Sequence, residues 1–298
     1  MTRQPLHGII AAVATPLKKN LRPDYDLFIS HCRHLLDAGC HGLGILGSTG
    51  EANSIHLDDR IKLIERAAEF LPKETLLVGT GSCAIAEAVQ LSRCAAENGI
   101  KNLLVLPPFY YTPVTDTGIR RYYDLLIEGI NDPEVCIFLY NFPKLTGYRF
   151  TSAVINDLID RHGDTIAGLK DSSGDLEGMM DYLTISPSFR VFSGTEEYLL
   201  DMIQAGGAGC ISATINITSS MARAVWDSHA PHLQNHLTEL RTAIQAHPLV
   251  PAVKAILASQ SGIPAWRTMA PPYVPLEGET ERQLLDTLGE LQRKDPRS

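Results

Sequence analysis

The feature that most constrains the fold is a junction between a helix and a strand, which occurs three times. The segments are LLDAGCHGLGILG at 35–47, AAENGIKNLLVLPP at 95–108 and MIQAGGAGCISAT at 202–214. In each, a helical pattern ends at a glycine that can adopt the left-handed conformation of a helix cap: Gly39, Gly99 and Gly206. A short apolar strand follows at once, so the chain repeats a helix-then-strand unit.

Eight segments of the chain have the apolar composition of buried strands. They are residues 7–14, 42–47, 75–80, 102–107, 135–141, 166–170, 189–193 and 208–213. Helical patterns separate most of them, which favours a parallel sheet covered on both faces. The number eight predicts an α/β fold of the closed (β/α)₈ TIM-barrel type, which commonly takes roughly 200 to 250 residues. An open, doubly wound sheet is the alternative.

The strand pattern stops after Asn216 and the remaining sequence is mostly helical. Only the segments PLVP at 248–251 and TMAPPYVPLEG at 268–278 interrupt it. We therefore expect residues 1–218 to form the barrel with the active site. Residues 219–298 are expected to form a helical region packed on the barrel, in preference to an independent domain.

The composition excludes some classes of partner. The formal net charge is −8 and the chain has no basic run, which argues against nucleic acid or an anionic membrane as a partner. No stretch approaches the roughly 18 consecutive apolar residues of a membrane span. The N-terminal apolar run breaks at Pro16 and is interpreted as the first barrel strand of a cytoplasmic protein.

Two motifs suggest cofactor or metal binding but lack the context for it. The segment GLGILG at 42–47 matches the GxGxxG dinucleotide fingerprint, yet its glycines fall inside the expected strand instead of after it. His229, His232 and His236 have helical spacing, but Pro231 interrupts them and no acidic or cysteine ligands accompany them. No cofactor and no metal ion are therefore expected.

Candidate reactive residues stand where apolar strands end, which is where a barrel of this type assembles its active site. They are GSTGE at 47–51, Tyr140 and Lys170. Lys170 could reach solvent or pair with Asp171, or it could form a Schiff base, because burial favours the neutral amine that attacks a ketone. Tyr140 could be a core aromatic or a proton carrier. GSTGE could be a helix cap or an anion site built from backbone amides.

Six segments in order along the chain carry a family resemblance. GSTGE, PPFYYTP, YNFPKLTG, GLKDSSG, SGTEE and GAGCISATIN resemble the dihydrodipicolinate synthase and N-acetylneuraminate lyase family of class I aldolases. The resemblance implies that Lys170 forms an imine with pyruvate or another 2-oxo acid and that Tyr140 shuttles protons. Thr49 and Ser48 would hold the carboxylate of the keto acid. Ser48 would also link Tyr140 to Tyr110, which in this family reaches across a tight dimer.

The resemblance also implies further contacts with the substrate. Ile211 would contribute a backbone contact to the keto acid, and Gly194 and Glu196 lie where lyases of the family contact a hydroxylated tail. The resemblance implies a homo-oligomer, either a dimer or a tetramer of tight dimers.

Leu145 bears on the choice of substrate. The synthases of lysine biosynthesis carry an arginine two residues after YNxP, where this chain has Leu145, and leucine cannot pair with a carboxylate. Lys144 stands one position earlier. The sequence YNFPxLTG, followed by GLKDS, is most similar to that of the 2-keto-3-deoxygluconate aldolase branch.

The predicted function is cleavage of a 2-keto-3-deoxy sugar acid to pyruvate and an aldehyde. Three alternatives stay open. A sugar acid dehydratase would use the same imine, a 4-hydroxy-tetrahydrodipicolinate synthase would condense pyruvate with aspartate semialdehyde, and a non-catalytic barrel would keep only the fold.

Overall fold

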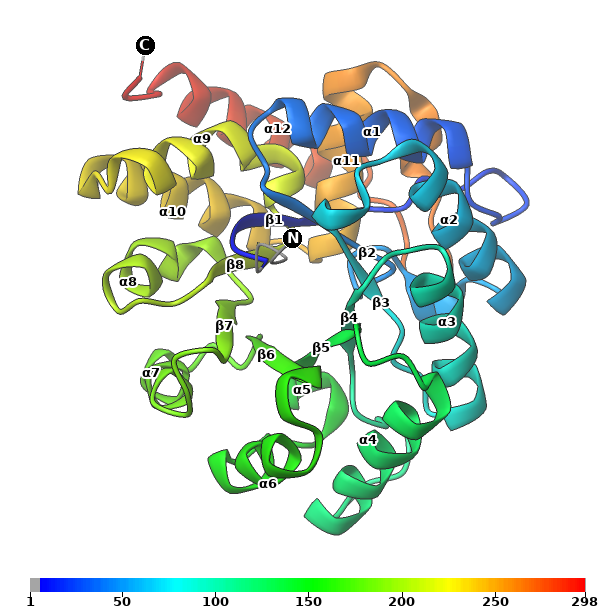
Figure 1. Cartoon of the computed structure of the whole chain (residues 1–298). Coiled ribbons are helices and arrows are strands. Elements are labelled where there is room, and N and C mark those ends of the chain that lie inside the picture. The colour runs from blue at the N-terminus through cyan, green and yellow to red at the C-terminus, as the bar shows by residue number, and fades with distance from the viewer. Residues whose placement is uncertain (1–5, 298) are drawn as a thin grey trace.

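Eight parallel strands form a closed barrel surrounded by helices in the computed structural model, which describes residues 6–297 (Figure 1). Neighbouring strands pair in sequence order, and β8 pairs with β1 to close the barrel. The strands are β1 (Gly8–Ala12), β2 (Gly42–Ile45), β3 (Leu76–Gly79), β4 (Asn102–Val105), β5 (Cys136–Asn141), β6 (Ile166–Asp171), β7 (Arg190–Ser193) and β8 (Gly209–Ser212). The predicted barrel is confirmed, and the open sheet is wrong because β1 and β8 have no free edge.

Helices connect the strands and continue after the last one. They are α1 (Tyr25–Asp37), α2 (Leu57–Phe70), α3 (Ile85–Glu97), α4 (Asp116–Ile130), α5 (Pro143–Thr146), α6 (Ser152–His162), α7 (Leu176–Leu183), α8 (Leu199–Gln204), α9 (Ile215–Ser228), α10 (Pro231–Gln245), α11 (Leu249–Ser261) and α12 (Gly278–Arg293). Short 3₁₀ helices are η1 (Ala52–Ser54), η2 (Lys73–Thr75), η3 (Gly163–Thr165), η4 (Glu196–Tyr198) and η5 (Pro264–Arg267).

The three glycine caps have the geometry expected of them. Gly39, Gly99 and Gly206 have φ values of 103°, 83° and 81°. After α1 the amide of Gly39 donates to Leu36 O and that of Cys40 to Leu35 O, which is the Schellman pattern. The helices after which these glycines stand therefore end abruptly, and the chain turns directly into β2, β4 and β8.

Several strands are shorter than predicted. The second expected strand, 42–47, ends at Ile45 because Leu46 adopts a left-handed φ of 56° and turns the chain out of the sheet. The first, 7–14, spans Gly8–Ala12. Apolar composition continues past each strand end because Val13, Ala14 and Leu46 are buried in the core as well.

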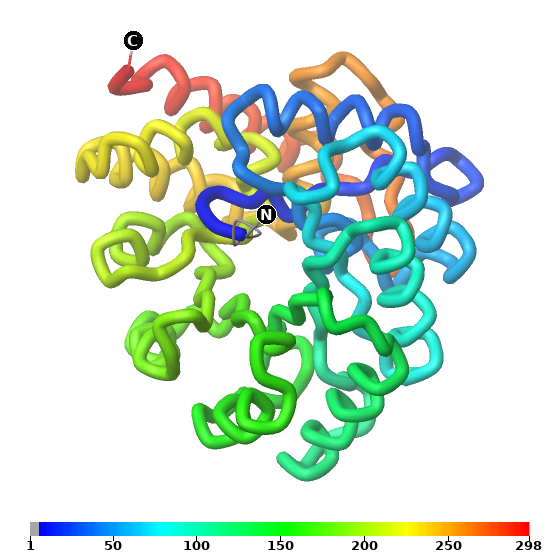
Figure 2. Tube along the Cα trace, in the orientation of Figure 1, coloured from blue at the N-terminus to red at the C-terminus, as the bar shows by residue number. Residues whose placement is uncertain are grey.

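The C-terminal region consists of helices that pack on the barrel wall. Helix α9 runs through the predicted boundary at 218/219, and the added helices begin with α10. Helix α10 packs against α9 and α12, so the end of the chain lies beside the last barrel helices (Figure 2). The first five residues and Ser298 of the predicted ranges lie outside the described residues.

The core has two layers that follow the alternation of side chains along the strands. Side chains between strands and helices form the larger cluster, whereas Ile10, Phe138, Phe192 and others meet inside the barrel. Successive side chains of a strand face opposite sides. Because Phe138 and Tyr140 face inward, the neighbouring strand β6 also directs Lys170 into the interior.

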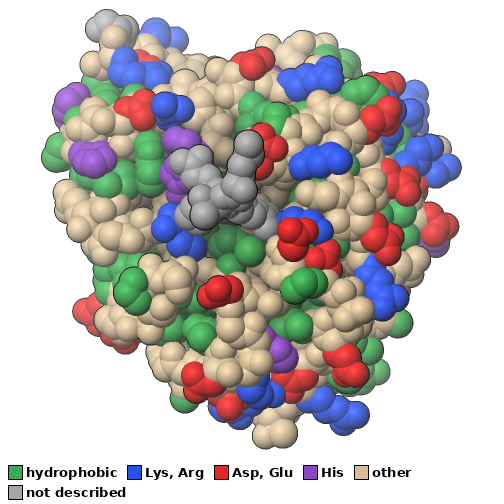
Figure 3. Space-filling model, viewed as in Figure 1, with side chains coloured by type: hydrophobic (Ala, Val, Ile, Leu, Met, Phe, Trp, Pro, Cys, Tyr) green, Lys and Arg blue, Asp and Glu red, His purple; other side chains and the backbone are tan. Residues whose placement is uncertain are grey.

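The surface carries both signs of charge. On the face shown in Figure 3, basic and acidic side chains are interspersed outside the grey atoms. Among residues 6–297, no helix combines the length and hydropathy needed to cross a membrane.

Candidate active site

Lys170 and Tyr140 meet inside the barrel. They are register partners on β6 and β5, and the Lys170 Nζ donates a hydrogen bond to the Tyr140 hydroxyl at 3.1 Å. The same nitrogen also lies 4.4 Å from the centre of the phenol ring. Both side chains are buried, with exposed fractions of 5% and 3%. An amine and a phenol within one proton transfer of each other can perform nucleophilic and acid–base chemistry together.

Asp171 is not the partner of Lys170. Its side chain faces away from the barrel interior, as expected for the next residue along a strand. Its carboxylate accepts a hydrogen bond from Asn141 Nδ2 at 2.6 Å and two from Ser173, through its amide at 2.8 Å and its hydroxyl at 2.5 Å. The Asp171 carboxylate therefore stabilises the end of β6, and the Lys170 amine bonds to Tyr140 instead.

A cavity of about 500 Å³ opens above these two residues at the carboxyl ends of the strands. It is of the size that small-molecule sites in proteins commonly have. Six of the residues predicted from the sequence line it: Ser48, Thr49, Tyr140, Leu145, Lys170 and Gly194. The structure thus brings together side chains that are up to 146 positions apart in sequence, from Ser48 to Gly194.

Residues Gly47–Glu51 form a tight turn on one side of this cavity. The amides of Gly50 and Glu51 donate to the carbonyls of Gly47 and Ser48, each at 3.1 Å. Within the described part of the chain, the amides and hydroxyls of Ser48 and Thr49 have no protein partner. We call Ser48 and Thr49 the cradle, because unpaired donors beside a cavity suit a carboxylate or another anion.

Gly194 lines the cavity where β7 ends. A methyl group added at this position would lie 2.2 Å from Ser172 Oγ and 2.6 Å from Asp171 O. The Gly194 amide donates to the same Asp171 carbonyl at 2.5 Å. Only glycine therefore fits this close approach between the ends of β6 and β7.

Three other predicted residues do not line the cavity. Glu196 is fully buried behind it, and its carboxylate accepts hydrogen bonds from Ser212, Thr214 and Thr218. Ile211 is buried inside the barrel on β8.

Tyr110 is the third, with 76% of its surface exposed and its ring edge-on to that of Tyr111, which is 78% exposed. Within the described residues of this single chain, no hydrogen bond joins Ser48 to Tyr140 or to Tyr110.

The C-terminal helices supply a wall of the cavity that the sequence did not suggest. Arg241, Gln245, Val250 and Tyr273 all line it. Arg241 Nη1 donates to Ser212 Oγ and Thr214 Oγ1, both at 2.9 Å, and lies 3.5 Å from Glu196 Oε2. These residues come from a region expected only to pack on the barrel. Arg241 and Gln245 lie in α10, where the sequence shows only a helical pattern. Val250 lies in the first turn of α11, within the interruption at 248–251, and Tyr273 lies in the interruption at 268–278.

The two motifs set aside in the sequence take no part in the cavity. In GLGILG, Gly42 and Gly44 lie inside β2, and the turn after it opens η1 instead of an α-helix. His229 caps the end of α9 with a φ of 55°, and Pro231 occupies the first turn of α10. Over residues 6–297, no group of three or more His, Cys, Asp and Glu side chains is arranged to hold a metal ion.

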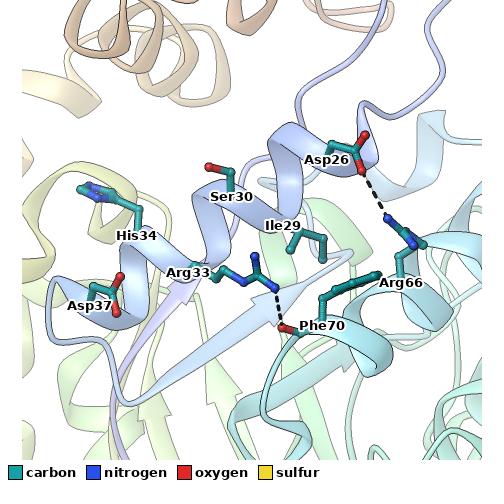
Figure 4. A pocket seen from close by; sticks show the side chains of 8 residues that line it. All are labelled: Asp26, Ile29, Ser30, Arg33, His34, Asp37, Arg66 and Phe70. Carbon is teal, nitrogen blue, oxygen red and sulfur yellow. Dashed lines mark hydrogen bonds and ion pairs between the residues drawn. The ribbon is translucent and has the colours of Figure 1, made fainter.

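A second cavity, of about 480 Å³, lies outside the barrel against α1 and α2 (Figure 4). The two arginines that line this cavity form hydrogen bonds with other residues of the protein. Arg33 donates to Phe70 O and Arg66 to Asp26 Oδ1, each at 3.3 Å, and both guanidinium groups pack on the Phe70 ring. It lies away from the strand ends, so the barrel cavity is the candidate active site.

Comparisons with known proteins match nearly the whole chain. Residues 5–291 match the model of the dihydrodipicolinate synthetase family. An uncharacterized DapA-like lyase of Chloroflexus aurantiacus is 33% identical over 91% of this chain and 92% of its own. A 4-hydroxy-tetrahydrodipicolinate synthase of Natronomonas pharaonis is 30% identical over 98% of this chain and 100% of its own.

Solved structures share the barrel over almost its full length. YagE, a prophage protein of the dihydrodipicolinic acid synthase family from E. coli K12, solved in complex with pyruvate, superposes with a TM-score of 0.87 at 26% identity. The match covers 97% of this chain and 99% of that one. A 2-keto-3-deoxygluconate aldolase from Sulfolobus, in complex with D-KDPG, reaches a TM-score of 0.87 over 96% of this chain and 97% of its own. At 21% identity it establishes only the common fold.

Proposed function

This chain belongs to the dihydrodipicolinate synthetase family of class I, Schiff-base-forming aldolases and lyases, and we propose that it cleaves a 2-keto-3-deoxy sugar acid to pyruvate and an aldehyde. The observation that carries this proposal is the buried pair of Lys170 and Tyr140, 3.1 Å apart at the base of a cavity. The cradle stands beside them with free donors for a carboxylate. The nucleophile Lys170, the proton carrier Tyr140 and the anion site therefore lie close enough together to act on one small keto acid.

The proposed reaction begins with imine formation. The neutral amine of Lys170 attacks C2 of the keto acid, and Tyr140 gives its proton to the departing hydroxyl, which leaves as water. The donors of Ser48 and Thr49 hold the carboxylate throughout. The product is a protonated imine, which can accept an electron pair from the neighbouring carbon.

Cleavage then uses the same two residues. The Tyr140 phenolate takes the proton of the C4 hydroxyl, the C3–C4 electron pair moves into the imine, and an aldehyde leaves. Tyr140 returns the proton to C3 of the enamine, which restores the protonated imine. Water hydrolyses this imine to pyruvate and the Lys170 amine, and the proton released goes back to the Tyr140 phenolate. A positioned general acid–base group of this kind contributes about 10²- to 10⁴-fold to a rate.

The choice of a sugar acid depends on the outer part of the cavity. Leu145 stands on its rim and offers no charge to a second carboxylate. Ser172, Ser173 and Thr195 also line the cavity and can hydrogen-bond to hydroxyl groups. Glu196 is not proposed as a direct contact, because its carboxylate is bonded by buried hydroxyls; it would act by holding Arg241.

One observation favours a second candidate, the synthase. Lys144 and Arg241 both line the cavity, so a cation is available for the carboxylate of aspartate semialdehyde despite Leu145. A dehydratase would use the same imine and would differ only in which bond of the substrate breaks.

A substrate panel separates these reactions. Purified protein is incubated with 2-keto-3-deoxy sugar acids, and pyruvate release is followed with a coupled reductase. The proposal predicts release of pyruvate and an aldehyde in equal amounts. Substrate consumption without pyruvate would identify a dehydratase, and condensation of pyruvate with aspartate semialdehyde would identify the synthase.

Tyr140→Phe provides the matched control for the panel. It keeps the ring that packs 5.6 Å from Phe142 but removes the hydroxyl. Turnover should fall by about 10²- to 10⁴-fold. If the variant kept full activity on the preferred substrate, Tyr140 would not be the proton carrier.

Tyr110 is proposed to complete a neighbour's site in a dimer. Its side chain and that of Tyr111 form an exposed aromatic pair, which is typical of surfaces that bind another protein. Within the dimer, the Tyr110 hydroxyl would approach Ser48 and Tyr140 of the other subunit and extend the proton relay.

A further inference from the structure

An ion pair lies behind the cradle, fully buried and outside the cavity. Lys254 on α11 donates a hydrogen bond to Glu51, and both side chains have an exposed fraction of 0%. Glu51 stands two positions after Thr49 of the cradle, and Lys254 comes from the C-terminal region 203 positions away. Neither residue lines the cavity.

Each member of the pair has a second bond that ties it to the segment before Tyr273. Glu51 Oε2 accepts from the Ala270 amide at 2.7 Å, and Lys254 Nζ donates to Thr268 O at 2.8 Å. Tyr273 itself lines the cavity. The pair therefore joins two walls of the cavity, the cradle and the Tyr273 segment.

The backbone of Glu51 needs this support. Its φ of 56° lies in the left-handed region, which is unfavourable for a residue other than glycine and persists only where surrounding contacts determine it. The Glu51 amide closes the cradle turn by donating to Ser48 O at 3.1 Å. A change in the Glu51 side chain would therefore change the direction of the Ser48 and Thr49 amides.

The charge on Lys254 depends on its partner. Burial lowers the pKa of Lys254 below its usual value, while the Glu51 carboxylate opposes that effect. A buried charge left alone is strongly destabilising, so the two residues act as a unit.

We propose that Lys254 is a positioning residue: through Glu51 it aligns the cradle amides and so sets the affinity of the enzyme for the carboxylate of the keto acid. This inference rests on the proposed carboxylate-binding role of Ser48 and Thr49. Lys254 touches no substrate atom, since it does not line the cavity. Its effect appears in the recognition of an anion and leaves the intrinsic reactivity of Lys170 unchanged.

The test measures imine formation instead of turnover. Borohydride reduces the imine to a stable secondary amine, and the rate of trapping is measured against the concentration of pyruvate or of pyruvamide, which lacks the negative charge. The variants are Lys254→Met and, because that change leaves Glu51 unpaired, the double variant Glu51→Gln with Lys254→Met. Leu284→Ala on α12, buried and away from the cavity, controls for loss of stability alone.

The half-saturating pyruvate concentration should rise at least about tenfold in whichever Lys254 variants fold, as expected when hydrogen bonds to a charged group are misaligned. The half-saturating concentration of pyruvamide should change little in these variants. In Leu284→Ala, neither the pyruvate nor the pyruvamide concentration should change. Equal changes for both ligands, or none, would overturn the inference while leaving the proposed function intact. If pyruvate failed to label Lys170 in the unmodified protein, the proposed function itself would be wrong.

Discussion

Three buried bases of this protein each form a hydrogen bond with a specific side chain. Lys170 bonds to Tyr140, Lys254 to Glu51, and His31 to Asn216. A polar group inside a protein is costly unless it is hydrogen-bonded, so these partners determine which conformation each base adopts. Two of the three pairs join segments that lie far apart in the sequence, and only Lys170 and Tyr140 occupy the cavity.

His31 should make the protein sensitive to mild acid. Its Nε2 donates to Asn216 Oδ1 at 2.9 Å, its ring lies edge-on to Trp266, and burial lowers its pKa to about 4. Between this value and the ordinary value of 6.5, the unfolded chain binds a proton that the folded chain does not. The free energy of unfolding should therefore fall as the pH falls, by about 2 kcal/mol from about pH 7.5 to about pH 5.

Urea denaturation of His31→Gln checks this origin of the acid sensitivity. The variant should lose less stability than the parent over that pH range, since glutamine does not titrate. His34→Gln, an exposed change on the same helix, serves as the control and should follow the parent. If the free energy of unfolding changed with pH equally in the parent and in His31→Gln, another group would be responsible for the acid sensitivity.

At the scale of elements, glycine has opposite effects in a barrel strand and in an outer helix. A methyl group on Gly168 in β6 would lie 2.2 Å from Arg190 O and 2.9 Å from Phe138 Cδ1. Gly289 in α12 has only Arg293 Nη1 nearby, at 3.8 Å. The first glycine allows β5, β6 and β7 to approach closely just before Lys170, whereas the second only weakens its helix.

Alanine substitution should separate the two roles. Gly168→Ala should destabilise the protein by about 1–3 kcal/mol, because the backbone of β6 or β7 must move. Gly289→Ala should stabilise it by up to about 1 kcal/mol through higher helix propensity. Urea denaturation measures both. A neutral Gly168→Ala would mean that the barrel absorbs the extra methyl group without strain.

The sequence predicted the elements well because the signals for them are local. Apolar strands, glycine caps such as Gly99 and the helical pattern all act over a few residues, and the order of strands follows from the barrel rule. The same rule placed Lys170 and Tyr140 at neighbouring strand ends. It could not place Arg241, because a helical pattern specifies an apolar face but not the surface that this face covers. It could not place Tyr273 either, because this residue stands in the segment 268–278, which has no periodic pattern.

At the scale of the whole molecule, the site depends on contacts that local patterns cannot reveal. Glu51 stands in a motif that the sequence singled out, yet its partner Lys254 is 203 positions away and carries no local mark. The family resemblance implied that Glu196 contacts the substrate; in the fold, hydroxyls from β8 and α9 surround its carboxylate. The barrel and its C-terminal helices therefore build one cavity jointly.

The most direct measurement of the central claim is covalent trapping at Lys170. The protein is incubated with pyruvate and borohydride, digested, and mapped by mass spectrometry; Lys170→Arg keeps the charge but supplies no nucleophilic amine and is the control. Imine formation at Lys170 predicts one added pyruvate-derived group, located on Lys170 and missing from the variant. Full activity without modification of Lys170, or labelling that persists at another lysine in Lys170→Arg, would contradict it.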